Sequence, residues 1–473
     1  MIRGWACPIH HQCSIPEISM QSISHRFIQA SALALGIAGV LAVSQAQAAG
    51  FQLRENSVKN LGRANSGITT AKDDASVVSN NPAAMVNLDR TTVRTDLTVI
   101  DLNAEFSGTG QAAVGTRLAS DLTGGNGGDP GSPTAVPALA IVHPLGDTGL
   151  TVGASVSAPF GLATEYDENW MGRYNAVESD VRVVDLTLSA GLKINEQFSV
   201  GLGLIYERAD VTLSNAVDFG AGICRLAAAL CLPPATAAYG PQKNDGFVKV
   251  SGNSTGIGWI AGLQWKPTDS LSIGLSHRSE VDHDLEGDAD FTVPGNVAPL
   301  VGAAYADGPI TAPLVLPSVT TLGVQYEFTD SFRMTGDVQW TDWHSLKSVD
   351  IYRDNAARTQ VAHESFEWED SKAYSLGAEF DLSEAFTLRG GLSLDQTPTQ
   401  DAHRSPRLPD NDRRIFAVGM TWNVSDTLSI DAAYMRIQIK DPSVHTVSSS
   451  GSLLSGEYSG NANLLGVGAQ LKF

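Results

Sequence analysis

The sequence NANLLGVGAQLKF, residues 461–473, decides the fold class of this chain. Apolar side chains stand at every second position, namely Leu465, Val467, Ala469, Leu471 and Phe473. The positions between them carry small or polar residues, namely Gly466, Gly468, Gln470 and Lys472. Alternation with a period of two is typical of a β-strand with one apolar and one polar face. The chain therefore ends in a predicted strand of an all-β protein.

The same alternation recurs upstream, and there the polar face carries charges. Within residues 332–341, Trp340 lies on the face opposite to Asp337, and residues 386–395 repeat this pattern. Charged side chains are tolerated on one face of such strands when that face lines a water-filled lumen. We therefore expect a transmembrane antiparallel β-barrel with an apolar outer surface and a polar lumen.

Counting these segments predicts about fourteen strands. They lie near residues 92–107, 135–146, 149–162, 179–195, 197–213, 248–267, 270–287, 314–328, 331–345, 368–381, 385–396, 413–424, 427–439 and 461–473. Tight turns such as Asn195-Glu196 and Ser425-Asp426 alternate with connections of roughly 16 to 35 residues. This asymmetry is typical of bacterial outer-membrane barrels, and an even number of strands places both termini in the periplasm. A soluble sandwich is the alternative, but it would not require the alternation in loop length.

Residues 1–48 have the features of a secretory signal region. We expect translation to start at Met20, because a short basic region, an apolar stretch over residues 30–43 and a small-residue site before Ala49 follow it. The apolar stretch is about 14 residues long, whereas a membrane-spanning helix requires roughly 20. The sequence thus predicts export, cleavage before Ala49 and no helical anchor.

Residues 49–90 separate this signal region from the first predicted strand. They are polar and glycine-rich, and they contain NLGRANSG (residues 60–67) and NNPAA (residues 80–84). Such a segment lacks the alternation of a strand. If residues 91–473 close into a barrel, the segment fits inside the lumen, where it would form a plug.

Six stretches, in this order, resemble the FadL-type outer-membrane transporters of long-chain fatty acids and other hydrophobic compounds (the FadL/TodX family). They are AGFQLRENSVKNLGRANSG (49–67), DDASVVSNNPAA (73–84), SAPFGLATEY (157–166), HRSEV (277–281), TDWHSLK (341–347) and LPDNDR (408–413). The resemblance covers nearly the whole chain after residue 48. It implies that apolar outer loops capture the substrate, that a pocket in the barrel holds it, and that it leaves sideways through a kinked third strand. Phe473 is similar to the terminal signal recognised by the barrel assembly machinery; an ordinary edge strand is the alternative.

The third predicted strand contains Pro159-Phe160-Gly161, which fits such a kink. Proline donates no ladder hydrogen bond and glycine permits a bend, so the strand would open toward lipid at this point. The ordinary end of a strand is the alternative. The resemblance further implies that Asn81-Pro82-Ala83 of the plug contacts this kink and that the Asn81 amide satisfies strand groups there. By itself, Asn-Pro is a turn signal.

Two outer connections are unusually apolar. They are residues 221–238, with Leu226 and Leu230, and residues 291–316, with Leu300 and Val301. These residues either form the collecting groove or pack together as a lid over the barrel mouth. Cys224 and Cys231 lie in the first connection, and an exported protein is more inclined to pair them in a disulfide than to use them as metal ligands or free thiols. Cys7 and Cys13 precede the expected start.

The resemblance assigns the charge that would meet a substrate carboxylate. Lys347 matches a basic residue that approaches the fatty-acid head group in the family, although a solvated lysine is the alternative. A second basic residue expected after the fifth strand is absent, since no base follows Arg208 in that stretch, and the parity of Arg208 points it outward. The carboxylate clamp is therefore incomplete, which leaves a neutral hydrocarbon, an aromatic compound or a less charged lipid as possible substrates.

A row of five acidic residues alternates with mostly apolar ones along the seventh predicted strand. The row consists of Asp282, Asp284, Glu286, Asp288 and Asp290. All five carboxylates would lie on one face, where they would bind a divalent cation or form a solvated extension of the strand.

Composition and missing motifs limit the function. The chain has 31 basic and 51 acidic residues and a net charge of −20, which makes nucleic acid an unsuitable ligand. It contains no P-loop, so we expect passive transport without a cofactor. We further expect a monomer whose partners are the hydrophobic substrate, outer-membrane lipid, lipopolysaccharide and, through Phe473, the barrel assembly machinery. The alternatives are a lipid or ester hydrolase, which lacks a G-x-S-x-G element here, and a general diffusion porin, which would need no plug.

Overall fold

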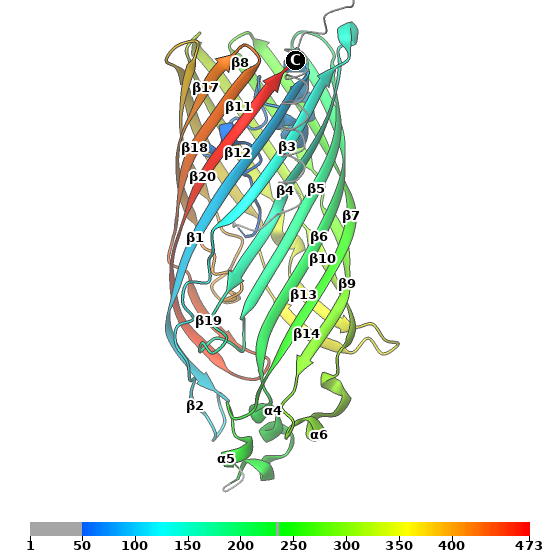
Figure 1. Cartoon of the computed structure of the whole chain (residues 1–473), viewed down its shortest axis with the longest axis vertical. Coiled ribbons are helices and arrows are strands. Elements are labelled where there is room, and N and C mark those ends of the chain that lie inside the picture. The colour runs from blue at the N-terminus through cyan, green and yellow to red at the C-terminus, as the bar shows by residue number, and fades with distance from the viewer. Residues whose placement is uncertain (1–49, 233–235) are drawn as a thin grey trace, which may run out of the picture.

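The computed structural model describes residues 50–232 and 236–473 (Figure 1). The expected start at Met20, the signal region 1–48, the cleavage site at Ala49 and the cysteines at positions 7 and 13 lie outside the described residues. No helix in the described part of the chain is long and apolar enough to cross a membrane.

The described strands close into an antiparallel barrel of 14 strands, as the alternation predicted (Figure 1). Ten of the 14 are single strands, namely β1 (Thr92–Ala112), β3 (Thr134–Pro144), β4 (Leu150–Glu165), β5 (Glu178–Lys193), β6 (Phe198–Asp218), β7 (Asp245–Thr268), β16 (Phe386–Asp395), β17 (Arg413–Ser425), β18 (Leu428–Ile439) and β20 (Leu453–Lys472). Each of the other four consists of two strands in succession, namely β8 (Leu271–Arg278) with β9 (Val281–Thr292), β10 (Gly308–Leu316) with β11 (Val319–Thr329), β12 (Phe332–Thr341) with β13 (Ser348–Arg353), and β14 (Gln360–Ser365) with β15 (Ser371–Asp381). The barrel closes where β1 pairs with β20, from Thr92 opposite Lys472 to Gln111 opposite Leu453.

Several strands differ from the prediction in length. The predicted strand 314–328 continues back through β10, with a break at Pro317, because proline cannot donate the ladder hydrogen bond. The hairpin of β13 and β14 falls where a loop was expected. Two short strands lie at the end of the barrel that carries the long loops (Figure 1). They are β2 (Ser120–Asp121), which pairs with β1, and β19 (Ser443–Val447), which pairs with β20.

Side chains alternate across the wall in the expected sense. On β6 the outward Leu202, Leu204 and Tyr206 are 67%, 55% and 50% exposed, whereas Ser199 and Glu207 face inward and are buried. The exposed apolar residues form the surface that lipid covers, because apolar area is stable only out of water. The prediction of an apolar exterior and a polar lumen is confirmed.

The two ends of the barrel differ as predicted. Tight turns lie at the end that carries the carboxyl terminus (Figure 1). The opposite end carries the long connections with their short helices, namely α4 (Phe219–Leu226), η3 (Ala228–Cys231), α5 (Thr236–Tyr239), α6 (Ala298–Val301) and η4 (Gly302–Tyr305). The remaining short helices are η2 (Gly146–Thr148) in a tight turn and η5 (Trp343–Ser345) after β12.

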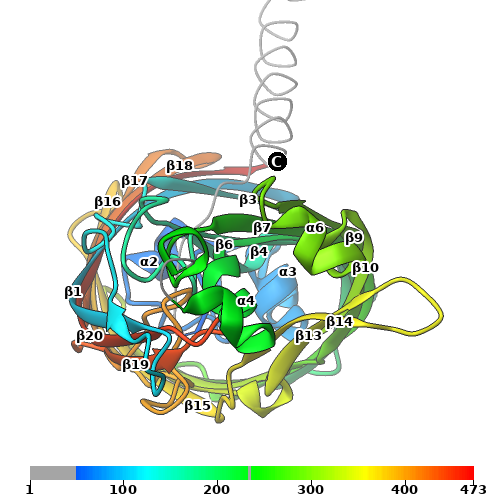
Figure 2. The same cartoon turned by 90° about the horizontal axis from the view of Figure 1, so that it is seen from below.

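Residues 50–90, here called the lumen segment, lie inside the barrel. The segment contains α2 (Val58–Leu61), α3 (Val77–Asn80) and η1 (Pro82–Asn87), and Figure 2 shows α2 and α3 within the ring of strands. Nearly all of it is buried, so its polar groups need partners from the wall. A segment too polar for lipid and too irregular for a strand thus occupies the lumen.

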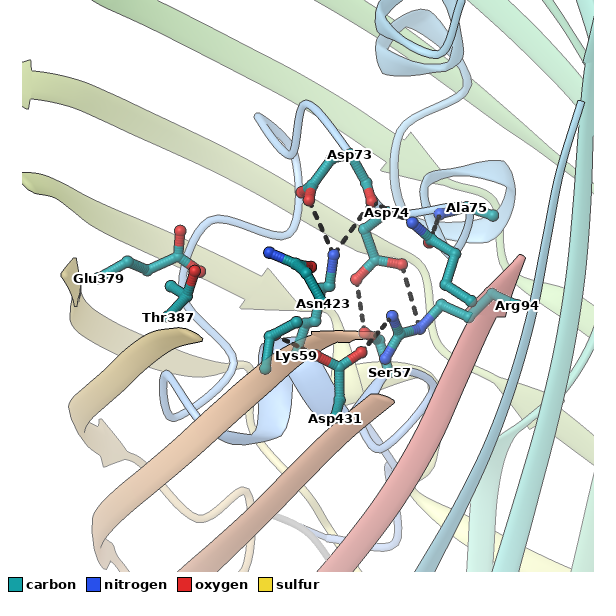
Figure 3. A network of polar contacts seen from close by, with 12 residues as sticks. Ser57, Lys59, Asp73, Asp74, Ala75, Arg94, Glu379, Thr387, Asn423 and Asp431 are labelled. Carbon is teal, nitrogen blue, oxygen red and sulfur yellow. Dashed lines mark hydrogen bonds and ion pairs between the residues drawn. The ribbon is translucent and has the colours of Figure 1, made fainter. Parts of the chain in front are cut away.

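Ion pairs attach the lumen segment to the wall formed by β1 and β18 (Figure 3). The guanidinium of Arg94 lies 3.4 Å from Asp74 of the segment and 2.9 Å from Asp431 of β18. The Asp74 carboxylate also accepts a 2.6 Å hydrogen bond from Ser57, and Lys59 forms an ion pair with Asp73 at 2.8 Å. Because charges buried away from water are stable only when they are paired, the Arg94–Asp74 pair holds the segment against β1, while the other two contacts of the segment join its own residues.

Candidate functional site

An apolar pocket, here called the inner pocket, lies inside the barrel beside the start of the lumen segment. Its lining consists of Phe51, Leu162, Val181, Val211, Leu213, Leu285, Leu314, Leu346, Val349, Phe366, Trp368, Arg407 and Leu408. Among these described residues, Arg407 is the only charged one. The pocket holds about 60 Å³, and Phe51 forms part of its wall. The Phe51 ring lies 5.0 Å from Trp343, 5.7 Å from Trp368 and 5.9 Å from Phe160, measured between ring centroids.

A larger cavity of about 670 Å³, here called the outer cavity, opens among the long loops. Its apolar lining includes Phe219, Leu300, Val301 and Tyr305. Leu213 and Arg407 line both cavities, so the two cavities are neighbours. The lining of the outer cavity also includes the charged residues Asp218, Arg225 and Glu364, so it is less apolar than the inner pocket.

Arg407 is held in place by a complete set of acceptors. Its Nε donates to Glu364 Oε1 at 3.1 Å, Nη1 donates to the carbonyls of Glu178 and Ser214 at 3.2 Å each, and Nη2 donates to Asn215 Oδ1 at 3.1 Å. Among the described residues, Glu364 is the ion-pair partner of Arg407, and the Glu364 side chain is 24% exposed. A guanidinium fixed in this way presents its charge at one point of an apolar wall.

Strand pairing in the wall is interrupted beside β4, the third strand of the barrel. The ladder between β3 and β4 ends at Leu139 and Val156, so residues 157–165 of β4 pair only with β5. The pairing of β4 with β5 is itself shifted between Ser157 and Phe160. Proline and glycine at this point therefore coincide with a local loss of strand pairing on the β3 side.

The start of the lumen segment supplies the missing partners. The amide of Leu53 donates to the Pro159 carbonyl at 2.7 Å, and the amide of Gly161 donates to the Phe51 carbonyl at 2.8 Å. The segment therefore adds a short strand to the exposed edge of β4, which closes the interruption from inside.

The expected contact of Asn81 with this kink is wrong. Its amide group donates to the carbonyls of Thr69 at 2.8 Å and Leu263 of β7 at 3.2 Å, and its Oδ1 accepts from Ala83 N at 3.1 Å. The residue approaches β7 closely because Gly262 has no side chain, and a Cβ there would collide with Asn81 Oδ1.

Pro82 and Ala83 lie beside β6 rather than beside the kink. The Ser199 hydroxyl donates to the Ala83 carbonyl at 2.8 Å, and a Cβ at Gly201 would collide with Pro82 and Ala83. Glycines in the wall thus position this part of the segment, while its extended first residues reach the kink.

Most of the other predicted site residues lie near the inner pocket or near the outer cavity. Lys347 is exposed and its Nζ donates to the carbonyl of Trp368, a lining residue, at 2.8 Å. Lys347 itself is not part of the lining of the inner pocket. Leu300 and Val301 line the outer cavity. Leu226 and Leu230 fall in α4 and η3, but their side chains lie outside the described part of the chain.

A disulfide joins Cys224 and Cys231 in the same loop, with their Cα atoms 5.4 Å apart. Arg225, between them in sequence, donates to the Ser450 carbonyl at 2.7 Å across the mouth of the outer cavity. The cross-linked loop therefore covers part of that mouth.

The five acidic residues of β9 lie on the outward face, as their alternation predicted. Asp282, Asp284, Glu286, Asp288 and Asp290 are exposed, and His283 and Leu285 between them are buried. In the described part of the chain, the carboxylate and histidine atoms close enough to share a metal ion belong to Asp342, His344 and Asp370, none of which is in this row. Cation binding by the β9 row stays a prediction.

Sequence reasoning missed Arg407 and Phe51 as site residues. Arg407 immediately precedes the LPDNDR stretch, where the surrounding prolines and charges show no alternation that could reveal an inward orientation. Phe51 stands alone in a polar segment, and an aromatic residue at that position is the one signal that could have indicated a buried contact.

Known proteins share this sequence and fold. The model of the family described as outer membrane protein transport protein (OMPP1/FadL/TodX) matches residues 39–473. The long-chain fatty acid transport protein of Escherichia coli (strain K12) is 30% identical over 428 residues, which cover 86% of this chain and 92% of that protein. Outer membrane protein P1 of Haemophilus influenzae is 28% identical over 427 residues, which cover 86% of this chain and 89% of that protein.

A crystal structure of a Pseudomonas aeruginosa FadL homologue has a TM-score of 0.80 and 25% identity, and the match covers 90% of this chain and 100% of that one. The Pseudomonas putida toluene transporter TodX has the same fold, with a TM-score of 0.65 at 17% identity over 90% of this chain. Together with the apolar outer surface, these matches identify the chain as a bacterial outer-membrane transporter of hydrophobic compounds. It belongs to the outer membrane protein transport protein (OMPP1/FadL/TodX) family.

Proposed function

We propose that this protein takes up long-chain fatty acids, or closely similar amphiphiles with a carboxylate head, by passive diffusion through the outer membrane. The observation that carries this proposal is the inner pocket, an apolar lining with the single charged side chain of Arg407. A hydrocarbon tail is stabilised by apolar walls at about 0.8 kcal/mol per methylene, and a guanidinium pairs with a carboxylate. The name of the Escherichia coli relative supports the same substrate class.

The proposed route begins in the outer cavity, where Leu300 and Val301 offer apolar surface at the mouth. The substrate then passes Arg407 into the inner pocket. It leaves sideways where β3 and β4 do not pair, beside Pro159-Phe160-Gly161. A lateral exit suits an oily molecule, because lipid accepts the tail that a polar lumen would hold poorly. No energy source is needed when the substrate moves down its concentration gradient.

The lumen segment is the proposed plug, with residues 49–90 as its bounds and residues 91–473 as the barrel. Phe51 lines the inner pocket, and the backbone of residues 51–53 pairs with β4 at the break in the wall. A substrate tail and the Phe51 ring would compete for the same apolar space. Binding would therefore favour withdrawal of residues 51–53, which uncovers the exit. Asn81-Pro82-Ala83 would keep the rest of the plug against β6 and β7.

Arg407 takes the role in this proposal that the family resemblance gave to Lys347. The guanidinium lines both cavities, whereas Lys347 lies outside the lining. Glu364 pairs with Arg407 in the free protein, and a substrate carboxylate would exchange for it. Because the Glu364 side chain is partly exposed, its release into water costs less than that of a buried carboxylate.

Four variants and two ligands of equal chain length test the substrate class. We expect Arg407→Gln to weaken binding of an 18-carbon fatty acid at least tenfold while leaving an 18-carbon alkane within threefold, measured by competition for a fluorescent fatty acid in detergent. Arg407→Lys should restore part of the loss because it keeps the charge. Glu364→Gln should strengthen fatty-acid binding, since it removes the competing carboxylate.

Lys347→Gln is the matched control, because it removes one positive charge behind the pocket. If it weakens fatty-acid binding as much as Arg407→Gln does, or if the acid and the alkane respond alike, the role of Arg407 is wrong. Equal binding of the acid by all four variants would remove the carboxylate from the proposal and leave a neutral hydrocarbon as substrate.

The proposal gives the chain no catalytic role, and it favours a monomer in contact with outer-membrane lipid and lipopolysaccharide. Phe473, whose side chain is 51% exposed, would serve as the terminal signal for the barrel assembly machinery. A general diffusion porin is the competing function. Free permeation of sugars through the reconstituted protein would favour it, because a plugged barrel should exclude them.

A further inference from the structure

A third cavity, of about 200 Å³, lies at the end of the barrel that carries the tight turns. Its lining combines the β5–β6 turn with Val86 and Asn87 of the lumen segment, and it includes three lysines, Lys72, Lys193 and Lys266. The tight turns of outer-membrane barrels face the periplasm, so this cavity opens there, on the side opposite to the outer cavity. We infer that it binds a small oxyanion, a carboxylate or a phosphate group, from the periplasm.

The positive charge in this cavity exceeds its negative charge. Lys72 pairs with Glu327 at 2.6 Å and Lys193 pairs with Glu196 at 2.7 Å. Lys266 forms no ion pair with any described residue, and its Nζ donates to the amide oxygen of Asn87 at 2.5 Å. A partly buried ammonium beside two others is unfavourable unless an anion compensates it. In a chain with a net charge of −20, this local excess of positive charge is unusual.

An unused hydrogen-bond donor lies in the same lining. Gln264 is 1% exposed, and its Oε1 accepts from Asn87 Nδ2 at 3.0 Å. Its Nε2 has no hydrogen-bond partner among the described residues, although it is buried. A buried donor without an acceptor costs about 1–3 kcal/mol, so an acceptor placed beside Gln264 Nε2 would be stabilising. The missing group must accept hydrogen bonds, which agrees with the charge of Lys266.

The donors select the class of ligand. Three lysines outnumber Glu196 among the described charged residues of the lining, which favours an anion with several oxygen lone pairs over a cation. Carboxylate and phosphate share this chemistry, and each can accept hydrogen bonds from ammonium and amide groups. The ligand would also contact the lumen segment through Asn87, the last residue of η1. This inference does not depend on Arg407 or on the lateral exit.

The test uses the exported protein, purified in a non-ionic detergent. Sodium phosphate and sodium acetate are titrated separately into it by isothermal titration calorimetry. We expect one equivalent of at least one anion to bind, with Lys266→Gln weakening the affinity at least tenfold and Gln264→Leu at least threefold. Lys440→Gln removes an equal charge from an exposed lysine at the other end of the barrel and should leave the affinity unchanged. Circular dichroism confirms that each variant is folded.

The choice of anion identifies the source of the ligand. Binding of phosphate alone assigns the site to free phosphate or a phosphate ester, and binding of acetate alone assigns it to a carboxylate. The inference is overturned if neither anion binds, or if Lys266→Gln and Lys440→Gln have the same effect. Loss of fatty-acid binding in the Arg407 variants leaves this result untouched, so the two proposals fail separately.

Discussion

The lumen segment is attached to the barrel differently on its two sides. Toward β1 and β18 it is held by buried charges, with Arg94 between Asp74 and Asp431 (Figure 3). Toward β4, residues 51–53 are held by the backbone hydrogen bonds of Phe51 and Leu53 and by packing of the Phe51 ring, and the next residue, Arg54, forms a buried ion pair with Asp395 of β16 at 3.1 Å. An ion pair that opens inside a closed lumen leaves unpaired charges, whereas an apolar ring can be replaced by another apolar group. The segment is therefore held by buried charges on the first side, whereas residues 51–53 are held by contacts that another apolar group could replace.

The largest effect is expected on the charged side. Arg94→Leu leaves Asp74, Asp96 and Asp431 buried without their cation, which should lower the free energy of unfolding by about 3–5 kcal/mol. Guanidinium chloride denaturation in detergent measures this loss. Arg208→Leu is the matched control, because Arg208 pairs with Asp210 on the exposed outer face, where such a pair contributes about 0–1 kcal/mol.

Equal losses for Arg94→Leu and Arg208→Leu would contradict the fixed side of the comparison. Limited proteolysis provides a second measurement. In Arg94→Leu the lumen segment should become susceptible to cleavage before the strands do, since its ion pair with β1 is gone.

A smaller effect is expected on the exchangeable side. Phe51→Ala removes a buried ring, but residues 51–53 can detach locally, so the global free energy of unfolding should fall by only about 1–2 kcal/mol. Hydrogen exchange of the Gly161 amide, which donates to the Phe51 carbonyl, should accelerate. The Val58 amide, which donates to Asp96 Oδ1 at 2.9 Å, should keep its protection.

Phe106→Ala provides the control for this prediction. Phe106 packs on Trp170 and Tyr458 near the long loops, away from the break in the pairing of β4 at Pro159. It should leave exchange at Gly161 unchanged. If Phe51→Ala deprotects Gly161 and Val58 together, the lumen segment moves as one body and the distinction between its two sides is wrong.

The same contrast explains what the sequence could predict. The wall was predictable because lipid outside and water inside impose a period of two on strands such as β6 and β20. The break at Pro159 was predictable because proline lacks the amide that a ladder requires. Both conclusions rest on local chemistry, which is visible in a single stretch of residues.

The contacts of the lumen segment were not predictable in this way. Asn81 could bond to any backbone carbonyl within reach, and only the glycines at positions 201 and 262, on strands distant in sequence, bring β6 and β7 close enough. Arg407 points into the pocket because acceptors from β5, β6 and β14 surround it. Positions fixed by several distant elements at once leave no periodic signal in the sequence.

The smallest effect concerns Lys59 and Asp73, at the rim of the charged side. The Lys59 ammonium holds the pKa of Asp73 below its usual range, so the carboxylate stays charged at acidic pH. A carboxyl whose pKa is lower in the folded protein contributes its stability above the unfolded value of about 3.9 and loses it only as the pH falls below that value. The Asp73 side chain is 58% exposed, which limits the contribution to about 0–1 kcal/mol.

The difference in unfolding free energy between wild type and Asp73→Asn should therefore be constant from pH 8 to about pH 5 and shrink below about pH 4. Denaturation midpoints at four pH values measure it, and a difference that grows toward acidic pH would contradict the lowered pKa. Because the Asp73 side chain is exposed and Arg94 is buried, the pH response of Asp73→Asn also separates the rim from the buried part of the charged side.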